Sequence, residues 1–264
     1  MIKLEMQNVT LAYGHQVVVK DITLHMKPGE MMGLVGPNGC GKTTIIKALS
    51  RVISPYSGRI LVNGRDISGI PRRDLACLLG VVPQIPLLPS AFTAFEVVLM
   101  GRNPHLGLFQ YEGAKDMAIA WRAMGETSTQ HLAHRRISEL SGGEIQGVVI
   151  ARVLTQETEA ILLDEPTANL DIGRQVEILD LIKSLCRENS LTVVAALHDL
   201  NLAAQYCDRL VLINNGQIHA EGTPGEVINI ANIRQVYGAG SYIYTHPLSG
   251  LPAVLPNAGS SKYG

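Results

Sequence analysis

A glycine-rich segment with one lysine and two threonines is the part of this sequence whose residue types and spacing most directly indicate chemistry. Its backbone N–H groups can surround a phosphate, because glycines permit positive φ and carry no Cβ. Lys42 can reach the β- and γ-phosphates of a nucleoside triphosphate, and the Thr43 hydroxyl can complete the shell of a bridging Mg2+. The segment fits the pattern of a glycine, four residues and then Gly-Lys-Thr, and it consists of Gly36, Pro37, Asn38, Gly39, Cys40, Gly41, Lys42, Thr43 and Thr44.

The alternative is a glycine-rich turn without a ligand, and the flanking sequence disfavours it. Residues 31–35 form an apolar run typical of a buried strand, and residues 43–50 carry apolar side chains at helical spacing. The segment would therefore join a strand to a helix N-terminus, whose partial positive charge attracts anions. This context predicts a loop that binds a nucleoside triphosphate.

Two carboxylates at the end of a second apolar run supply the other half of such a site. Residues 160–163 are typical of a buried strand, and Asp164 and Glu165 follow directly. Ligands of open α/β sheets bind at the carboxyl ends of strands. We therefore expect Asp164 to hold Mg2+ through water and Glu165 to accept a proton from the attacking water. The alternative is a polar strand terminus without a catalytic role.

The elements that must position these groups begin with antiparallel strands. Alternating residues predict strands at 2–13 and 16–26, and the Asn-Gly pair at 63–64 predicts a hairpin turn. A proline-rich stretch at 83–89 then gives way to helix-forming sequence at 94–154, which predicts an inserted helical segment.

A parallel core is predicted from buried strands at 78–82, 160–163 and 191–197, with an amphipathic helix at 174–187 between the last two. Clusters of Gly, Pro, Ser and Tyr after Tyr237 predict an irregular appendage. The expected fold class is α/β: a P-loop NTPase (RecA-like) core with an antiparallel β subdomain and an inserted helical subdomain.

Composition excludes several classes of function. The 264 residues include 22 basic and 23 acidic side chains, so electrostatics favours neither nucleic acid nor an anionic membrane. Hydrophobic residues make up 46% of the chain, but no apolar run approaches the roughly 18 to 20 residues that cross a bilayer. The start of the sequence lacks the apolar core of a signal peptide. The four cysteines are scattered, which fits a reducing cytosol.

The run Leu140, Ser141, Gly142, Gly143 and Glu144 lies between the two halves of the site. Locally it predicts a capping box, in which Ser141 and Glu144 cap the helix that follows. With this run the sequence resembles the ATP-binding cassette (ABC) family, in which the motif contacts the γ-phosphate held by the opposite subunit. The resemblance covers nearly the whole chain and implies an ATPase that works as a homodimer, with ATP and Mg2+ as ligands.

Other family landmarks follow in the family's order. Tyr13 resembles the aromatic residue that stacks on adenine, although it could be an ordinary strand tyrosine. Gln84 resembles the glutamine that links the magnesium site to the helical subdomain. His198 resembles the switch histidine that contacts the γ-phosphate, although a solitary histidine is more often structural. Residues 168–171 resemble the loop at the dimer seam, and Asp171 could equally cap a helix.

The chain departs from the family pattern at two positions. Glu144 stands where many members have glutamine, and Gly147 stands where relatives generally have arginine. A glycine inside a helix costs roughly 1 kcal/mol relative to alanine. The resemblance implies an ATPase domain at residues 1–225, with the helical subdomain inserted at about 86–158, and a C-terminal extension at 226–264.

Residues 97–107, 197–203 and 246–252 together resemble the metal-chelate importers, which carry ferric siderophores, haem or cobalamin. The resemblance implies that two copies of this chain bind two membrane-spanning permease subunits at the cytoplasmic face of the membrane. It also implies a separate extracytoplasmic substrate-binding protein that delivers the cargo. ATP binding would then join Lys42 of one copy to Ser141 of the other, and hydrolysis would separate them.

Two alternatives remain open. One is a soluble ABC ATPase without a transport channel, as in iron–sulfur cluster assembly or translation. The other is a P-loop kinase or a non-hydrolysing regulator, which should lack both the Ser-Gly-Gly motif and the glutamate after Asp164.

Overall fold

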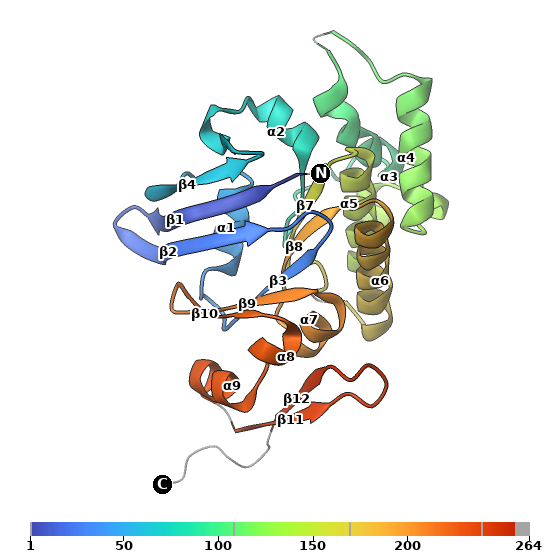
Figure 1. Ribbon diagram of the computed structural model, residues 1–264. Helices are drawn as coiled ribbons and strands as arrows, with labels where there is room; N and C mark the ends of the chain where they lie inside the picture. Colours follow the sequence, from blue (N-terminus) through green and yellow to red (C-terminus); the bar gives the residue numbers. More distant parts are fainter. Residues whose placement is uncertain (1, 108, 169, 239, 257–264) are drawn as a thin grey trace.

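A six-stranded sheet with β3 (Met31–Val35) near its middle forms the core of the protein (Figure 1). All five residues of β3 are buried, because both faces of this sheet are covered. The strand order is β10-β9-β3-β8-β7-β6, and only β10 runs antiparallel to its neighbour. The other strands are β6 (Leu79–Val82), β7 (Ala160–Asp164), β8 (Thr192–Ala196), β9 (Arg209–Asn214) and β10 (Gln217–Gly222). The α/β class predicted from the sequence is confirmed.

The computed structural model describes residues 2–107, 109–168, 170–238 and 240–256. Within these ranges, every helix is too short or too polar to cross a bilayer. The helices outside the predicted insertion are α1 (Lys42–Leu49), η1 (Ile67–Gly69), α2 (Arg72–Leu78), α6 (Ile172–Glu188), α7 (Leu200–Tyr206), α8 (Pro224–Val227) and α9 (Ile230–Tyr237).

A second, antiparallel sheet lies beside the core sheet, as the sequence predicts. Its order is β2-β1-β4-β5, and its strands are β1 (Leu4–Tyr13), β2 (Gln16–Met26), β4 (Ser57–Val62) and β5 (Arg65–Asp66). One apolar cluster joins Met6 of β1, Ile45 of α1 and Leu34 of β3. Helix α1 is therefore buried between the two sheets, which fixes the loop at its N-terminus.

The predicted insertion is helical and has an apolar cluster of its own. It consists of α3 (Ala94–Leu99), η2 (Met100–His105), α4 (Ala114–Glu126), η3 (Gln130–Leu132), η4 (Ile137–Glu139) and α5 (Gly142–Thr155). Val97, Met124 and Val148 lie in this cluster, whereas Ile150 and Val153 on another face of α5 join the cluster of the core sheet. Helix α5 thus connects the insertion to the core.

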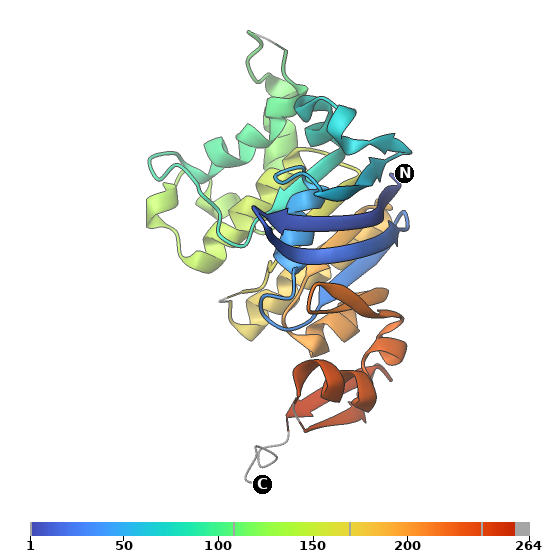
Figure 2. The same cartoon turned by 90° about the vertical axis from the view of Figure 1, so that its left-hand side faces the viewer.

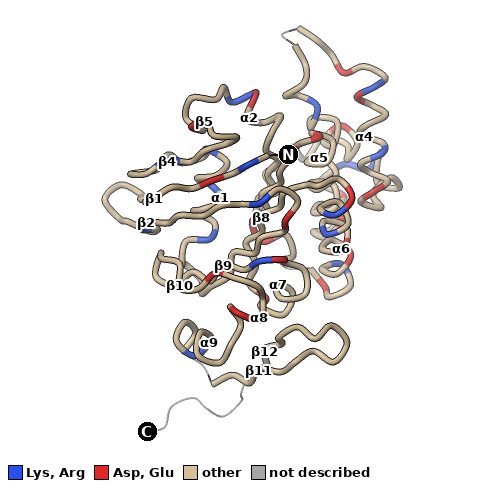
Figure 3. Tube along the Cα trace, in the orientation of Figure 1, with Lys and Arg blue, Asp and Glu red and all other residues tan. Residues whose placement is uncertain are grey.

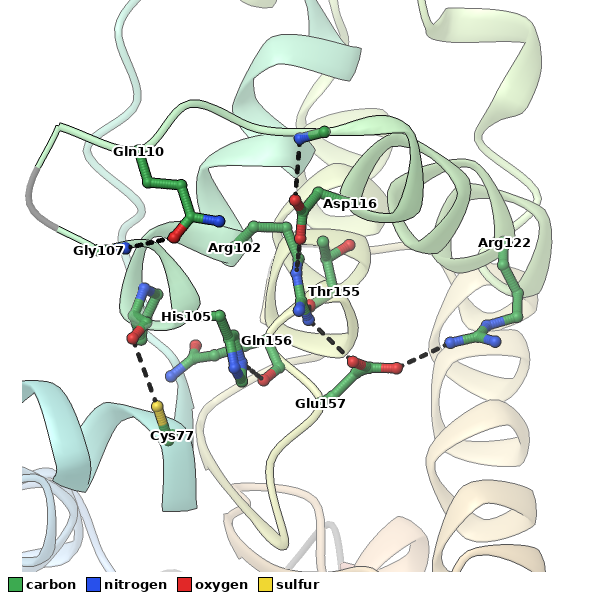
Figure 4. A network of polar contacts seen from close by, with 12 residues as sticks. Cys77, Arg102, His105, Gly107, Gln110, Asp116, Arg122, Thr155, Gln156 and Glu157 are labelled. Atoms are coloured by element: carbon green, nitrogen blue, oxygen red, sulfur yellow. Dashed lines mark hydrogen bonds and ion pairs between the residues drawn. The ribbon is translucent and has the colours of Figure 1, made fainter.

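A buried arginine links the end of α5 to the rest of the insertion (Figure 4). Arg102 of η2 is 4% exposed, and its Nε lies 2.9 Å from Oδ1 of Asp116 at the start of α4. Its Nη1 donates to the carbonyl of Thr155, the last residue of α5, and to Oε2 of Glu157 just beyond the helix, each at 2.9 Å. Glu157 also pairs with the exposed Arg122 at 2.9 Å. One guanidinium therefore ties η2 to the start of α4 and to the end of α5.

The prediction of an irregular appendage after Tyr237 is wrong. The two strands β11 (Ser241–Thr245) and β12 (Pro252–Pro256) form a hairpin there. This hairpin carries no Lys, Arg, Asp or Glu and lies at the opposite end of the molecule from the loop between η2 and α4 (Figures 1, 2 and 3). Ile243 and Val254 pack against the core cluster. Asn201 of α7 donates to the Val254 carbonyl at 3.2 Å and accepts from its N–H at 2.7 Å.

The hairpin of β9 and β10 was also missed. Its signal is the Asn-Gly pair at 215–216, where both residues have positive φ, between two runs with apolar residues.

We expect Arg102→Ala to lower the free energy of unfolding by about 2 to 4 kcal/mol, because Asp116, Glu157 and the Thr155 carbonyl would lose a buried cationic partner. Urea unfolding of the purified chain measures this loss. Arg122→Ala is the matched control, since Arg122 pairs with the same Glu157 but is exposed, and we expect a loss below about 1 kcal/mol. Equal losses for the two variants would contradict the assignment.

Candidate active site

The glycine-rich loop leaves the carboxyl end of β3 and enters α1. Gly36, Gly39 and Gly41 all have positive φ, at 147°, 77° and 112°. A Cβ at Gly36 would lie 2.2 Å from the Ile213 carbonyl oxygen, and one at Gly41 would lie 2.6 Å from a methyl group of Val19. Positions 36 and 41 therefore require glycine for space as well as conformation. The free N–H groups at the start of α1 adjoin this loop and favour an anion there.

Lys42 is buried within the loop that it belongs to. It is 4% exposed, and its Nζ donates to the carbonyl oxygens of Gly36 at 2.7 Å and Pro37 at 3.1 Å. The Sγ of Cys40 lies 3.9 Å from the same nitrogen. The loop thus fixes an ammonium group beside the backbone that would surround a phosphate.

Thr43 and Asp164 meet across the site. The Thr43 hydroxyl donates to Oδ1 of Asp164 at 2.8 Å. Asp164 is 5% exposed, and burial raises the pKa of its carboxyl although the Thr43 hydrogen bond acts in the opposite direction. A buried carboxylate beside a hydroxyl is a pair of hard oxygen donors that a divalent cation would stabilise in the charged form. The two residues therefore fit a Mg2+ ion.

Glu165 directly follows Asp164, and its backbone has a φ of 53°. A positive φ is uncommon outside glycine and often accompanies function. The side chain accepts a hydrogen bond from Nε2 of Gln84 at 2.6 Å, and its other oxygen contacts Nε2 of His198. Gln84 and His198, which the sequence also predicts for the site, thus contact the two oxygens of the Glu165 carboxylate and orient it.

These groups share one cavity of about 470 Å3 with the phosphate loop. It is lined by Val18, Asn38, Gly39, Gly41, Lys42, Thr43, Thr44, Gln84, Glu165 and His198. The cavity brings together the Lys42 ammonium, the backbone of the phosphate loop and the Glu165 carboxylate. These groups can stabilise and catalyse the transfer of a phosphoryl group to water. Sequence reasoning missed Val18, because an apolar strand residue carries no chemical signal.

Tyr13 is placed differently. It ends β1 and is 47% exposed, but it is absent from the lining of the cavity. Its predicted stacking on adenine stays a prediction.

The Ser-Gly-Gly motif forms the capping box that the sequence predicts. The Ser141 hydroxyl accepts from the Glu144 N–H at 3.4 Å, and Oε2 of Glu144 accepts from the Ser141 N–H at 2.7 Å. Ser141 and Gly142 are exposed. Gly143 and Glu144 line a separate cavity of about 310 Å3. Within one chain the motif therefore does not line the cavity of the phosphate loop.

Position 147 of α5 is occupied by glycine for a structural reason that helix propensity does not reveal. A Cβ at this position would lie 2.8 Å from Cγ2 of Thr129, which is itself buried. The turn before η3 approaches α5 so closely that alanine would have to displace it. Gly147→Ala would therefore not gain the stability of about 1 kcal/mol that helix propensity alone predicts.

Asp171 caps α6, as one of the two sequence readings predicts. Its Oδ1 accepts from the Arg174 N–H at 2.9 Å. Asn169 of the predicted seam loop lies outside the described residues, and the role of this loop at a dimer seam stays a prediction.

Comparison with known proteins identifies a family whose sequence profile matches this chain. The sequence profile described as ABC transporter matches residues 19–168. The ferric enterobactin transport ATP-binding protein of Escherichia coli strain K12 is 37% identical over 254 residues, which cover 96% of this chain and 94% of that protein.

Solved structures agree with this match. A candidate metal-chelate type ABC transporter in an inward-facing conformation has a chain with a TM-score of 0.84 and 27% identity, with 97% of each chain covered. A dimeric bacterial ABC transporter cassette has a TM-score of 0.76 and 28% identity, and the match covers 83% of this chain and 98% of that one.

We expect the capping box to give the stability of the chain a specific pH dependence. Hydrogen bonds from the Ser141 N–H and hydroxyl hold the pKa of Glu144 below its ordinary value of 4.5. The stabilisation is therefore present above pH 4.5 and is lost as the pH falls through the lowered pKa. Glu144→Gln should be less stable by about 0.5 to 1 kcal/mol at pH 7, and the difference should vanish in acid.

Urea midpoints measured from about pH 3 to about pH 7, a range that spans the ordinary carboxyl pKa values, test this expectation. The control is Glu112→Gln, since Glu112 has no hydrogen bond or ion pair within the described part of the chain. A Glu144→Gln profile parallel to wild type would contradict a charge-dependent capping box.

Proposed function

The chain belongs to the ABC transporter family, and on this premise we propose that it powers an importer of metal chelates, namely ferric siderophores, haem or cobalamin. Members of the family hydrolyse ATP to power transport, and this chain is an ATPase subunit of that kind. The single observation that carries the chemistry is the cavity in which Lys42, Thr43, Gln84, Glu165 and His198 meet. The chelate class is supported by the ferric enterobactin relative and by the structural likeness to a metal-chelate type transporter.

We assign the phosphate contacts to the loop and its lysine. Nζ of Lys42 donates to the Gly36 carbonyl at 2.7 Å and thus lies beside the loop. A rotation of this side chain brings the ammonium to the β- and γ-phosphates. The backbone N–H groups of the loop and the start of α1 bind the remaining phosphate oxygens. A bound Mg2+ would neutralise charge that develops on the phosphates. Thr43, Asp164 and Gln84 are the residues that would hold it.

We assign the water to Glu165. Gln84 and His198 fix its two oxygens, so the carboxylate can orient a water in line with the γ-phosphate and accept its proton. His198 is 42% exposed in its side chain and lines the same cavity, which leaves its ring available to the γ-phosphate. Removal of the Glu165 carboxylate therefore stops hydrolysis without removing the phosphate contacts.

The partners follow from the exposed capping motif. Ser141 and Gly142 face solvent, and Gly143 lines a cavity other than that of the phosphate loop. We infer that they complete the site of a second copy, with Asp171 at the seam. The dimeric cassette among the structural relatives supports this arrangement. Two such subunits would bind two membrane-spanning permease subunits at the cytoplasmic face of the membrane, and an extracytoplasmic binding protein would deliver the chelate.

Glu165→Gln should form a stable dimer when ATP and Mg2+ are present, because binding is retained while hydrolysis is blocked. Gel filtration of the purified variant with and without ATP measures this. Lys42→Ala should stay monomeric under both conditions, since it loses its phosphate contact. A Glu165→Gln chain that remains monomeric with saturating ATP would sink the proposal that Ser141 acts in the opposite site.

Transport itself is tested by uptake of labelled ferric siderophore, haem and cobalamin in the native host. Cells that carry Lys42→Ala should lose uptake of one of these cargoes and keep that of the others. Selective loss names the substrate class. Unchanged uptake of all three, from a variant shown to lack ATPase activity, would reject chelate import and favour a soluble ATPase role.

A further inference from the structure

The last residue of α9 reaches the phosphate loop from the C-terminal extension. Tyr237 packs against the apolar cluster of the core sheet, which contains Val35 at the end of β3 and Leu212 of β9. Val35 immediately precedes Gly36, and Leu212 is its partner in the parallel pairing. A residue some 200 positions later in the sequence is thus packed against the cluster that contains the strand residue before Gly36.

The hydroxyl of this tyrosine is buried and has no hydrogen-bond partner, which distinguishes it from every other buried side-chain nitrogen or oxygen of the described residues. An unpaired buried polar group is destabilising, so one that persists in a native protein calls for an explanation such as a role in another state of the site.

The groups around this hydroxyl belong to the phosphate loop. Burial and then the neighbouring Cys40 thiol raise the pKa of Tyr237, the backbone N–H of Gly36 lowers it, and the net value is about 12. The Gly36 N–H is therefore near the phenol oxygen, although the contact falls outside hydrogen-bond geometry.

The same two residues hold the lysine of the active site. Nζ of Lys42 donates to the Gly36 carbonyl at 2.7 Å, and Sγ of Cys40 lies 3.9 Å from it. Close packing transmits displacement here, since a Cβ added at Gly36 would lie 2.8 Å from the Cys40 sulfur. The phenol and the ammonium are thus both neighbours of Gly36 and Cys40.

The extension is also fixed to the other half of the site. Helix α9 packs on β11, and the paired β12 is bound at Val254 by the side-chain amide of Asn201. Asn201 lies in the first turn of α7, three residues after His198. The unit of α9, β11 and β12 therefore contacts both the phosphate loop and the helix that follows the histidine.

We propose that Tyr237 is a positioning residue for the phosphate loop, and that its hydroxyl accepts a hydrogen bond from the Gly36 N–H when the loop closes on a nucleoside triphosphate. The C-terminal extension thereby contributes to ATP affinity without contacting the nucleotide. This inference rests on the ATP-binding function of the chain. It gives the extension a role in the site that its sequence, rich in Gly, Pro, Ser and Tyr, does not indicate.

Tyr237→Phe tests the proposal, because it keeps the ring and removes one oxygen atom. We expect the dissociation constant for a non-hydrolysable ATP analogue with Mg2+ to rise about three- to tenfold, the effect of one ordinary hydrogen bond. The urea midpoint without nucleotide should stay the same or rise, since an unpaired buried hydroxyl is removed. In steady state, KM for ATP should rise while kcat stays close to that of wild type.

The matched control is Tyr242→Phe, which removes the same atom from an exposed tyrosine of β11 and should bind the analogue like wild type. Wild-type affinity in Tyr237→Phe would overturn the inference, and so would an affinity loss accompanied by an equal loss of stability. Wild type and Lys42→Ala, titrated in parallel, separate the two levels of the argument. If wild type itself fails to bind the analogue, both the ATPase assignment and the inference fall, whereas tight binding by wild type and Tyr237→Phe alike rejects the inference alone.

Discussion

The register of three parallel strands is the constraint on which the rest of the structure depends. Leu34 of β3 and Asp164 of β7 both pair with Ala196 of β8, so the phosphate loop, the carboxylates and His198 leave the sheet at the same level. A slip of one residue would turn the side chain of Asp164 to the other face of the sheet. Because all residues of these strands are buried on both faces, the close packing of differently shaped side chains, rather than a polar–apolar alternation, opposes such a slip.

The site built on this edge keeps several groups in unfavourable states. The carboxyl of Asp164 is buried with a raised pKa, Glu165 has a positive φ, and the Tyr237 hydroxyl has no partner in the described residues. Glu165 lines the cavity that the phosphate loop also lines, Asp164 is bonded to Thr43 of that cavity, and Tyr237 is a neighbour of Gly36 in the loop. Local strain and unpaired groups of this kind are stabilised by the surrounding fold and are retained where binding later satisfies them.

Helix α5 gives the insertion its mechanical role. Its N-terminus presents Ser141 to solvent through the capping box, while its last turn is held by the buried Arg102. One face packs in the insertion and another packs on the core sheet. A movement of η2 or α4 relative to the core would therefore act on the last turn of α5, and the helix would carry it to the motif that we assign to the opposite site.

The sequence by itself determined the parts whose chemistry is local. The glycines of the phosphate loop, the acidic pair after an apolar strand, the Ser141–Glu144 capping box and the Asp171 cap all follow from residues within a few positions of one another. Only the tertiary structure decided which distant residues meet. Gln84 and Glu165 are 81 positions apart, Asn201 and Val254 are 53 apart, and Thr129 packs against Gly147 from another segment. Such contacts depend on how helices and strands pack, and packing is set by the complementary shapes of whole surfaces, which local spacing does not encode.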